Sequence, residues 1–105
     1  MIFVFGPLWS GKRAVARELF PDADTVFDAQ ELAREREDLD ALADELARHD
    51  VVIATEVGGG VVPADRAERA ARERAGRLNC LLAARADAVV RVFCGIPKVI
   101  KGELP

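Results

Sequence analysis

Residues 1–13 read MIFVFGPLWSGKR, and this stretch combines the patterns of a strand, a loop and the start of a helix. Residues 2–5 form a continuous apolar run, which is typical of a strand that is covered on both faces. Gly6 follows the run, four residues intervene, and Gly11-Lys12 then precede apolar residues at helical spacing. A strand, a glycine loop with a lysine, and a helix in this order are the context that a phosphate-binding loop (P-loop) requires.

Such a loop binds phosphate through its backbone and its lysine. Glycines let backbone N–H groups turn toward phosphate oxygens, the helix N-terminus adds a partial positive charge, and the lysine adds a full one. Gly6, Gly11 and Lys12 are therefore candidate phosphate contacts. The alternative interpretation of these residues is a glycine turn with a surface lysine.

The residue after the lysine departs from the P-loop pattern. Ser or Thr is expected there, because its hydroxyl binds Mg²⁺. Arg13 stands at this position and cannot ligate a metal, but a guanidinium pairs well with phosphate oxygens. The loop therefore favours nucleotide binding over metal-assisted transfer. Trp9, in the same loop, stacks on a nucleotide base, covers apolar surface or forms an oligomer contact.

The composition is that of a soluble, globular, single-domain protein. The chain has 105 residues, and we expect one P-loop-type α/β domain over residues 1–105. The net charge of −3 argues against nucleic-acid binding, which calls for a basic patch. Because no apolar run is long enough to cross a membrane, we expect no membrane association and a cytoplasmic location. Cys80 and Cys94 are isolated, and we expect both to be buried free thiols.

Strand and helix patterns alternate along the rest of the chain. This alternation implies a mostly parallel sheet with right-handed crossovers and helices on its faces. We therefore predict a small three-layer P-loop NTPase-like α/β domain. The predicted elements are strands at residues 2–5, 25–27, 51–55 and 89–94 and helices at about 13–19, 29–46 and 65–84, with a tail at 95–101.

Polar features follow three of the predicted strands at their carboxyl ends, where open α/β sheets bind ligands. Residues 6–13 follow the first strand, Asp28 the second, and Glu56 with residues 58–60 the third. We expect these groups to converge on one edge of the sheet. Asp28 is a candidate metal ligand or the N-cap of the next helix. Glu56 is a candidate to hold Mg²⁺, to accept a substrate proton, or to cap the loop that follows it.

Residues 55–66, TEVGGGVVPADR, resemble the Asn-Glu-Val-Gly-x-Gly-Ile-Val-Pro-x-x-Arg signature of a known family. These are the bifunctional adenosylcobinamide kinase/adenosylcobinamide-phosphate guanylyltransferases of cobalamin biosynthesis. The resemblance continues through residues 75–79, Ala84, residues 86–89 and 95–101 and, with the loop at residues 6–13, covers well over half of the chain.

This resemblance implies a P-loop α/β fold, commonly assembled as a trimer, so we expect a homo-oligomer. It implies phosphoryl transfer from ATP or GTP, with Mg²⁺, to the hydroxyl of a corrinoid, followed by GMP transfer through a guanylylated histidine. Lys12 and Glu56 are then the candidate catalytic residues, and Asp28 the candidate metal ligand. The candidate nucleotide-binding residues are Gly6, Trp9, Ser10, Gly11, Lys12, Arg13, Gly58, Gly60 and Arg66, with Pro63 a further match to the signature.

Three features depart from the family pattern. Arg13 replaces the metal-binding hydroxyl, Thr55 replaces the signature asparagine, and the segment that carries the guanylylated histidine is missing before the strand that ends at Asp28. His49, the single histidine, follows a predicted helix, where it interacts with the helix dipole. We therefore expect guanylyltransferase activity by the family route to be absent.

Three functional hypotheses follow. The first is a reduced kinase of the adenosylcobinamide type, and the second is a non-catalytic nucleotide-binding protein. The third is an assembly module in which Arg13 occupies the phosphate site.

Overall fold

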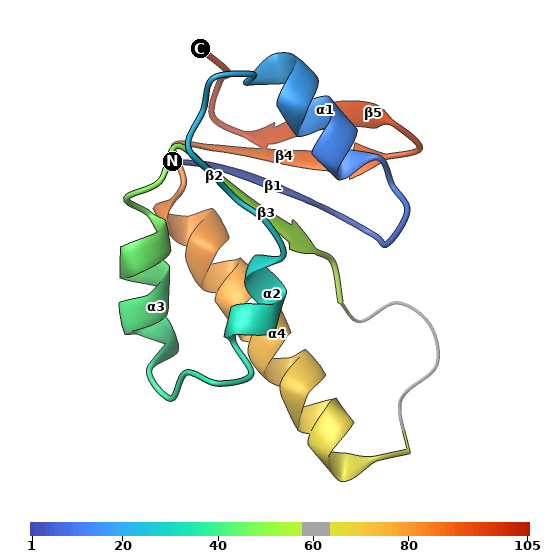
Figure 1. The fold of residues 1–105 in the computed structure, drawn as a ribbon, viewed down its shortest axis with the longest axis vertical. Coiled ribbons are helices and arrows are strands. Elements are labelled where there is room, and N and C mark those ends of the chain that lie inside the picture. The colour runs from blue at the N-terminus through green and yellow to red at the C-terminus, as the bar shows by residue number, and fades with distance from the viewer. Residues whose placement is uncertain (58–63) are drawn as a thin grey trace.

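A computed structural model describes residues 1–57 and 64–105, and these residues form five strands and four helices. Figure 1 shows a sheet with α1 on one face and α2, α3 and α4 on the other. The elements, in chain order, are β1 Ile2–Gly6, α1 Lys12–Leu19, β2 Thr25–Val26, α2 Ala29–Leu32, α3 Leu39–Leu46, β3 Val51–Thr55, α4 Arg66–Arg85, β4 Ala88–Phe93 and β5 Ile96–Lys101.

β1 is the central strand of the sheet, whose strand order is β2-β3-β1-β4-β5. It pairs in parallel with β3 and with β4, so that Ile2 lies opposite Val51 on one side and Ala88 on the other. β2 pairs with β3 in parallel, and β5 pairs with β4 antiparallel. The predicted mostly parallel sheet is confirmed.

Two apolar clusters, one on each face of the sheet, form the core. Val4 of β1 packs with Val15 and Ala16 of α1 on one face. Phe3, the neighbouring residue of β1, packs with Leu42 of α3 and Leu78 of α4 on the other face. Successive strand residues point to opposite faces, so the continuous apolar run of β1 supplies both clusters. The predicted three-layer α/β architecture is confirmed.

The single helix that we predicted over residues 29–46 is wrong, because the chain forms two helices there. Asp38 interrupts it: its Oδ1 accepts a hydrogen bond from the backbone nitrogen of Ala41 at 3.0 Å, which makes it the N-cap of α3. Arg74 of α4 stabilises the segment between the two helices, since its guanidinium donates to the carbonyl oxygens of Ala33 and Arg36.

Two further expectations are also wrong. The tail that we expected over residues 95–101 is largely the antiparallel strand β5, which pairs with β4 through a tight turn at Gly95, where φ is 74°. Cys80 and Cys94 are free thiols, as expected, but both are exposed. Within the described part of the chain, no helix is both long and apolar enough to cross a membrane.

Candidate phosphate-binding site

The connections that leave β1 and β3 place the candidate site. These strands are neighbours, yet β1 leads to α1 on one face of the sheet and β3 leads to α4 on the other. In open α/β sheets a ligand-binding crevice forms where neighbouring strands send their connections to opposite faces. The topology therefore places the crevice at the carboxyl ends of β1 and β3, next to the loop that we predicted to bind phosphate.

Two positions of this loop favour glycine, Gly6 for lack of room and Gly11 for its backbone conformation. A Cβ atom on Gly6 would clash with the carbonyl oxygen of Val92 and would lie 2.7 Å from Ser10 Oγ. Gly11 has a φ of 85°, and a Cβ there would lie 3.3 Å from the Cα of Gly95. The backbone nitrogen of Gly95 also donates to the carbonyl oxygen of Ser10 at 2.7 Å. The turn between β4 and β5 thus packs against the loop after β1 and is hydrogen-bonded to it.

Lys12 and Ser10 are the two buried polar side chains of the loop, with exposed fractions of 7% and 4%. The Nζ atom of Lys12 donates to the carbonyl oxygen of Pro7 at 3.3 Å. Burial lowers the pKa of Lys12; the carboxylate of Asp28 opposes this effect and the guanidinium of Arg13 adds to it. Ser10 Oγ is buried without a hydrogen-bond partner among the described residues. Both groups would gain a partner from a bound anion.

The N-terminus of α1 is open to an anion in the same way. Gly11 occupies the N-cap position and has no side chain with which to cap the helix. The N–H groups of the first helical turn lack intrahelical partners, and the helix dipole adds partial positive charge there. These are the backbone properties that bind phosphate at the start of a helix.

Arg13 binds Asp28 in this structure. Its Nη2 atom donates to Oδ2 of Asp28, and its guanidinium lies 5.2 Å from the ring centroid of Phe27. Arg17, one turn further along α1, lies 5.6 Å from the same centroid. Asp28 occupies the N-cap position of α2, but its side chain does not cap that helix. The N-cap alternative is therefore correct for the position of Asp28 and not for its side chain.

Glu56 also binds an arginine. Its carboxylate accepts two hydrogen bonds from Arg91 of β4, from Nε at 3.0 Å and from Nη2 at 2.9 Å. This ion pair raises the pKa of Arg91. The backbone nitrogen of Glu56 donates to the carbonyl oxygen of Gly6 at 2.7 Å. Glu56 therefore connects the end of β3 to the end of β1 and, through Arg91, to β4.

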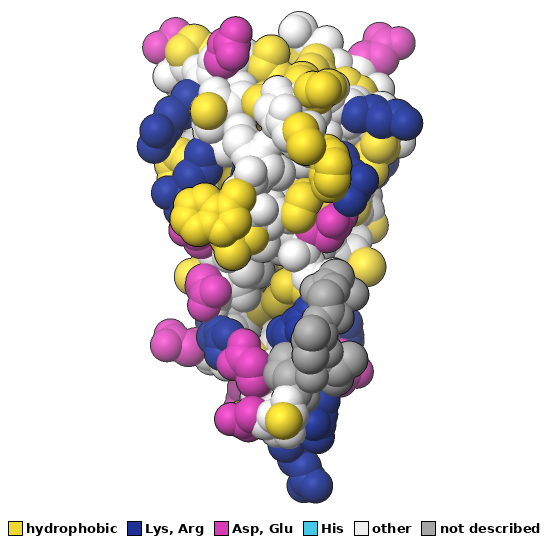
Figure 2. All heavy atoms as spheres, turned by 90° about the vertical axis from the view of Figure 1, so that its right-hand side faces the viewer, with side chains coloured by type: hydrophobic (Ala, Val, Ile, Leu, Met, Phe, Trp, Pro, Cys, Tyr) yellow, Lys and Arg dark blue, Asp and Glu magenta, His cyan; other side chains and the backbone are white. Residues whose placement is uncertain are grey.

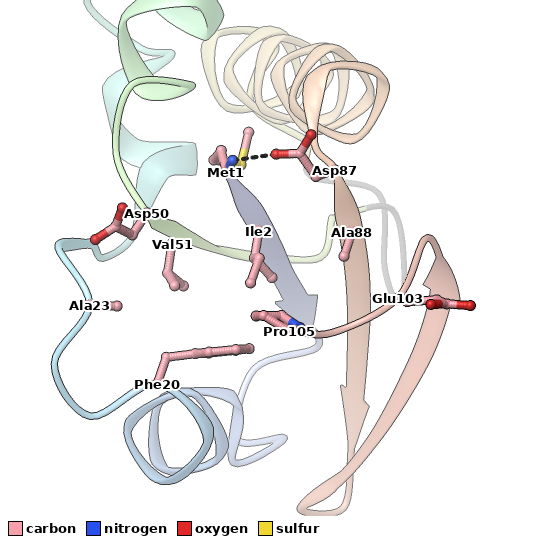
Figure 3. Close-up of a pocket in the computed structure, with 10 residues that line it drawn as sticks. All are labelled: Met1, Ile2, Phe20, Ala23, Asp50, Val51, Asp87, Ala88, Glu103 and Pro105. Carbon is pink, nitrogen blue, oxygen red and sulfur yellow. Dashed lines mark hydrogen bonds and ion pairs between the residues drawn. The ribbon is translucent and has the colours of Figure 1, made fainter.

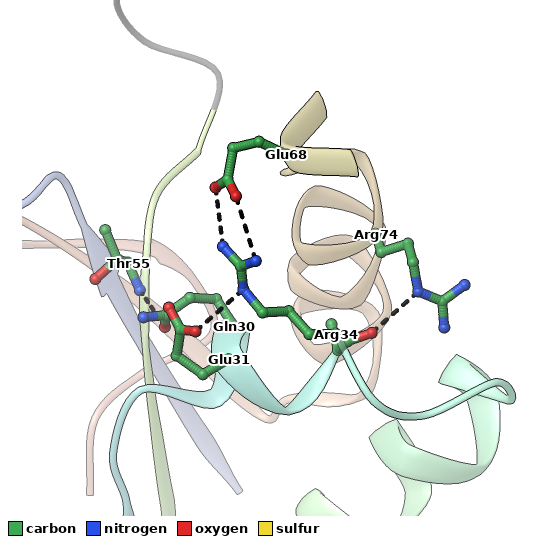
Figure 4. A network of polar contacts seen from close by, with 7 residues as sticks. Gln30, Glu31, Arg34, Thr55, Glu68 and Arg74 are labelled. Atoms are coloured by element: carbon green, nitrogen blue, oxygen red, sulfur yellow. Dashed lines mark hydrogen bonds and ion pairs between the residues drawn. The ribbon is translucent and has the colours of Figure 1, made fainter. Parts of the chain in front are cut away.

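Thr55, the last residue of β3, is held on both sides through its backbone. Its nitrogen donates to Gln30 Oε1 at 2.9 Å, and its carbonyl oxygen accepts from Asn79 Nδ2 at 3.3 Å. Figure 4 shows Gln30 next to a second network, in which Arg34 binds Glu68 and Glu31. Residues of α2 and α4 thus fix the end of β3.

Two hollows adjoin at this edge of the molecule, and Leu8 and Thr55 line both. The first, of about 460 Å³, follows the loop from Leu8 to Ala14 and also includes Arg17 and Asp28. The second, of about 380 Å³, lies between α2, the end of β3 and α4. Figure 2 looks onto this edge, where hydrophobic side chains lie next to Lys and Arg side chains in the upper half of the view. The two hollows could hold two substrates side by side.

The other predicted site residues lie in different places. Trp9 is 92% exposed at the rim of the first hollow. Arg66 is the first residue of α4, whose first turns lie away from the sheet and from the loop after β1 (Figure 1). Gly58, Gly60 and Pro63 lie outside the described residues.

His49 is far from this edge. It follows α3 just before β3 begins, at the opposite end of the strands from the loop. Its Nδ1 atom lies 2.8 Å from Oδ2 of Asp24. In this position its ring cannot reach a nucleotide that is bound at the loop.

Sequence reasoning missed the partners that hold the candidate residues. Arg91 binds Glu56, Phe27 lies under Arg13, and Gln30 and Asn79 hold Thr55. One signal was present, because Asn79 lies within the stretch that resembles the family. An arginine in a strand and a phenylalanine before an aspartate carry no comparable signal.

The residues present do not fit a metal site built by the protein. The position that would supply a hydroxyl is Arg13, and it binds the carboxylate of Asp28. Among residues 1–57 and 64–105, no three His, Cys, Asp or Glu side chains are grouped so that they could hold a metal ion. The metal role of Asp28 stays a prediction, and it would require the Arg13–Asp28 pair to open.

Comparison with known proteins identifies the family. The model of the cobinamide kinase / cobinamide phosphate guanyltransferase family matches residues 20–100. A stretch of 51 residues is 49% identical to the bifunctional adenosylcobalamin biosynthesis protein CobU of Salmonella typhimurium. This stretch is 49% of the chain and only 28% of the length of that relative. The family match covers most of the chain and agrees with its α/β fold, so the chain belongs to the cobinamide kinase / cobinamide phosphate guanyltransferase family.

Proposed function

We propose that the chain binds a nucleoside triphosphate, ATP or GTP, at the loop after β1 and transfers its γ-phosphoryl group to the hydroxyl of cobinamide. The observation that carries this proposal is the loop itself, where three features surround one hollow. They are buried Lys12, the start of α1 at Gly11, and the Ser10 hydroxyl, which has no partner among the residues that the structure describes. Family membership supports the choice of reaction and of acceptor.

In this proposal the loop supplies positive charge and position. Lys12 and the N–H groups of the first turn of α1 bind the β- and γ-phosphate oxygens, and Ser10 Oγ donates to one of them. Gly6 and Gly11 let the backbone approach the phosphates closely. Catalysis then comes mainly from alignment and from neutralisation of the charge on the transferred group.

The second hollow would hold the acceptor. Because Thr55 and Leu8 line both hollows, a hydroxyl that enters from the second one lies next to the phosphates. The hydroxyl oxygen forms a bond to the γ-phosphorus, the bond from that phosphorus to the bridging oxygen breaks, and the hydroxyl proton leaves. Glu56 lines the second hollow, so we assign it the role of orienting the hydroxyl and accepting its proton.

One observation favours a second candidate, a nucleotide-binding protein without turnover. Both carboxylates to which we assigned chemistry, Asp28 and Glu56, are bonded to arginines. A carboxylate in such a pair must first leave its arginine before it can hold a metal ion or contact a substrate hydroxyl. The third hypothesis, in which Arg13 fills the phosphate site, has less support, since Arg13 binds Asp28 instead of the loop.

A phosphoryl-transfer assay separates the two candidates. The chain is incubated with cobinamide and γ-labelled ATP or GTP, and label in the corrinoid fraction is measured beside nucleotide binding. The kinase proposal expects label that is lost in Lys12→Ala and retained in Lys98→Ala, a control on exposed β5. Nucleotide binding without any label transfer would favour the second candidate.

We also propose that the chain forms a homo-oligomer. β5 is exposed along its whole length, and Phe93, Ile96 and Ile100 are large apolar side chains exposed on β4 and β5. Apolar surface of this kind commonly marks a contact between protein chains. Light scattering at micromolar concentration tests this proposal, and a monomer mass would contradict it.

A further inference from the structure

The Arg13–Asp28 pair places a fixed cation beside the phosphate loop. Arg13 is the second residue of α1, directly after Lys12, and both residues line the first hollow. The Asp28 carboxylate and the ring of Phe27 hold its guanidinium there, although the side chain is half exposed. The guanidinium is thus held at the rim of the hollow, within the lining of the nucleotide site.

The charges of the lining suit an anion that arrives without a metal. Lys12, Arg13 and Arg17 bring three cationic side chains to the first hollow, against the single carboxylate of Asp28. A divalent cation between the phosphates and Asp28 would first have to displace Arg13. The metal ion would then lie next to the guanidinium of Arg13, and two positive charges at short distance repel each other.

We propose that Arg13 supplies to the phosphates the positive charge that a divalent cation supplies in the usual loop, so that the chain binds nucleoside triphosphate without Mg²⁺. This inference rests on the proposed function, because it concerns the same nucleotide site. In the free protein Asp28 is the anionic partner of Arg13, and in the complex the phosphates take its place. A guanidinium suits this exchange, since it pairs with carboxylate and phosphate oxygens in similar geometry.

The geometry of Asp28 agrees with this role. Its backbone lies in the left-handed region, with φ 54° and ψ 44°, which aspartate adopts more readily than most residues with a side chain. Its carboxylate leaves the N–H groups of α2 uncapped and binds Arg13 instead. The side chain therefore acts as an internal competitor for the cation that binds phosphate.

Calorimetric titration of ATP and of GTP, in EDTA and in Mg²⁺, tests the inference. The wild type should bind in EDTA within about threefold of its affinity in Mg²⁺, because its own guanidinium supplies the charge. Arg13→Ser should weaken binding in EDTA by about 10- to 100-fold and recover part of the loss in Mg²⁺. Arg48→Ser, which removes the same charge after α3 at the opposite end of the strands, is the matched control.

Asp28→Asn gives the sharpest test, because a competitor role and a metal-ligand role of Asp28 predict different results in EDTA. If Asp28 competes for Arg13, the variant should bind nucleotide in EDTA several-fold more tightly than the wild type. If Asp28 holds a metal ion, the variant should bind more weakly in Mg²⁺ and unchanged in EDTA. Asp22→Asn, at an exposed aspartate in the turn before β2, controls for the loss of charge.

The outcomes separate the inference from the proposed function. Binding by the wild type that is at least about tenfold weaker in EDTA than in Mg²⁺ overturns the inference and leaves the nucleotide site in place. Absence of binding in both buffers overturns the proposed function together with the inference. Thermal unfolding of each variant shows whether it is folded.

Discussion

The two ends of the parallel strands carry hollows of nearly the same size and opposite chemistry. The hollow at the carboxyl ends, about 460 Å³, is lined by Lys12, Arg13 and Arg17. The hollow at the other end, about 480 Å³, has Asp50 and Glu103 in its lining. Figure 3 shows the hollow at this opposite end, with apolar side chains toward its middle and carboxylates around it. The volumes of the two hollows therefore do not distinguish the proposed phosphate site from the other end.

The difference between the ends follows from the direction of the chain. Helix α1 begins at the carboxyl end of β1 and directs its first N–H groups and its positive dipole end there. At the opposite end the amino group of Met1 is bound by the carboxylate of Asp87 at 2.8 Å, which leaves little positive charge for a ligand. Of these two hollows, the one at the carboxyl ends therefore suits a polyphosphate better, as judged from the described residues.

The largest expected effect comes from adding a side chain to Gly6, in the loop at the carboxyl end of β1. Gly6→Ala places a methyl group against the carbonyl oxygen of Val92 and should destabilise the fold by about 3 kcal/mol or more. Gly76→Ala, inside α4, is the matched control. Its Cβ would lie 3.4 Å from Cγ2 of Val57, which is an ordinary contact distance. It should stabilise the chain by up to about 1 kcal/mol. Chemical denaturation measures both; equal effects would show that the loop does not pack as described.

Removing the lysine should abolish most nucleotide binding at the same end. In our account Lys12→Ala deletes a charge-assisted contact to phosphate. It should weaken the binding of ATP and of GTP by about 10- to 150-fold. Lys98→Ala, an exposed lysine of β5, should change the affinity by less than about threefold. Fluorescence of Trp9, the single tryptophan, is a convenient readout at the rim of the hollow. Equal losses in the two variants would mean that only overall charge matters.

The pH dependence of binding should report Lys12. Its pKa is lowered in the free protein, mainly by burial, and a bound phosphate would raise it again. Affinity should therefore be constant below the lowered pKa of the free lysine and fall as the pH rises through it toward about pH 10. A flat profile over this range would contradict the assignment of Lys12 to the phosphates.

The smallest effects are expected at the acidic end. The amino group of Met1 lowers the pKa of Asp87, so this pair contributes stability above the usual aspartate pKa, and the contribution is lost as the pH falls through the lowered value. Asp87→Asn should slightly destabilise the chain at neutral pH and become equal to the wild type in acid. Its nucleotide affinity should not change. A loss of affinity in Asp87→Asn would indicate that the nucleotide binds at the end of the strands where Asp87 lies, and it would contradict our account.

The sequence predicted the sheet and the loop well because both depend on local patterns. Continuous apolar runs mark β1 and β3, and only glycine fits at Gly6 and Gly11. The split between α2 and α3 was missed because charged residues continue the helical pattern past the Asp38 N-cap. β5 was missed because an exposed edge strand buries no apolar face that would reveal it.

The ion pairs of the site could not be predicted, because their partners are distant in the sequence. Arg13 meets Asp28 and Glu56 meets Arg91 only after β2, β3, β1 and β4 are side by side. These pairs also change the chemistry that the single residues suggest. A carboxylate that looks like a metal ligand or a base in the sequence is the partner of a guanidinium in the fold.

Amide chemical-shift mapping with unlabelled GTP on ¹⁵N-labelled chain tests the central claim most directly, because it observes both ends of the strands in one titration. Our account predicts the largest shifts at Gly11, Lys12 and Arg13, at the start of α1. It predicts little change at Ala23 and Ala88, which line the opposite hollow. Shifts centred on Ala23 and Ala88, or no shifts at saturating GTP, would contradict the claim that the loop after β1 binds nucleotide.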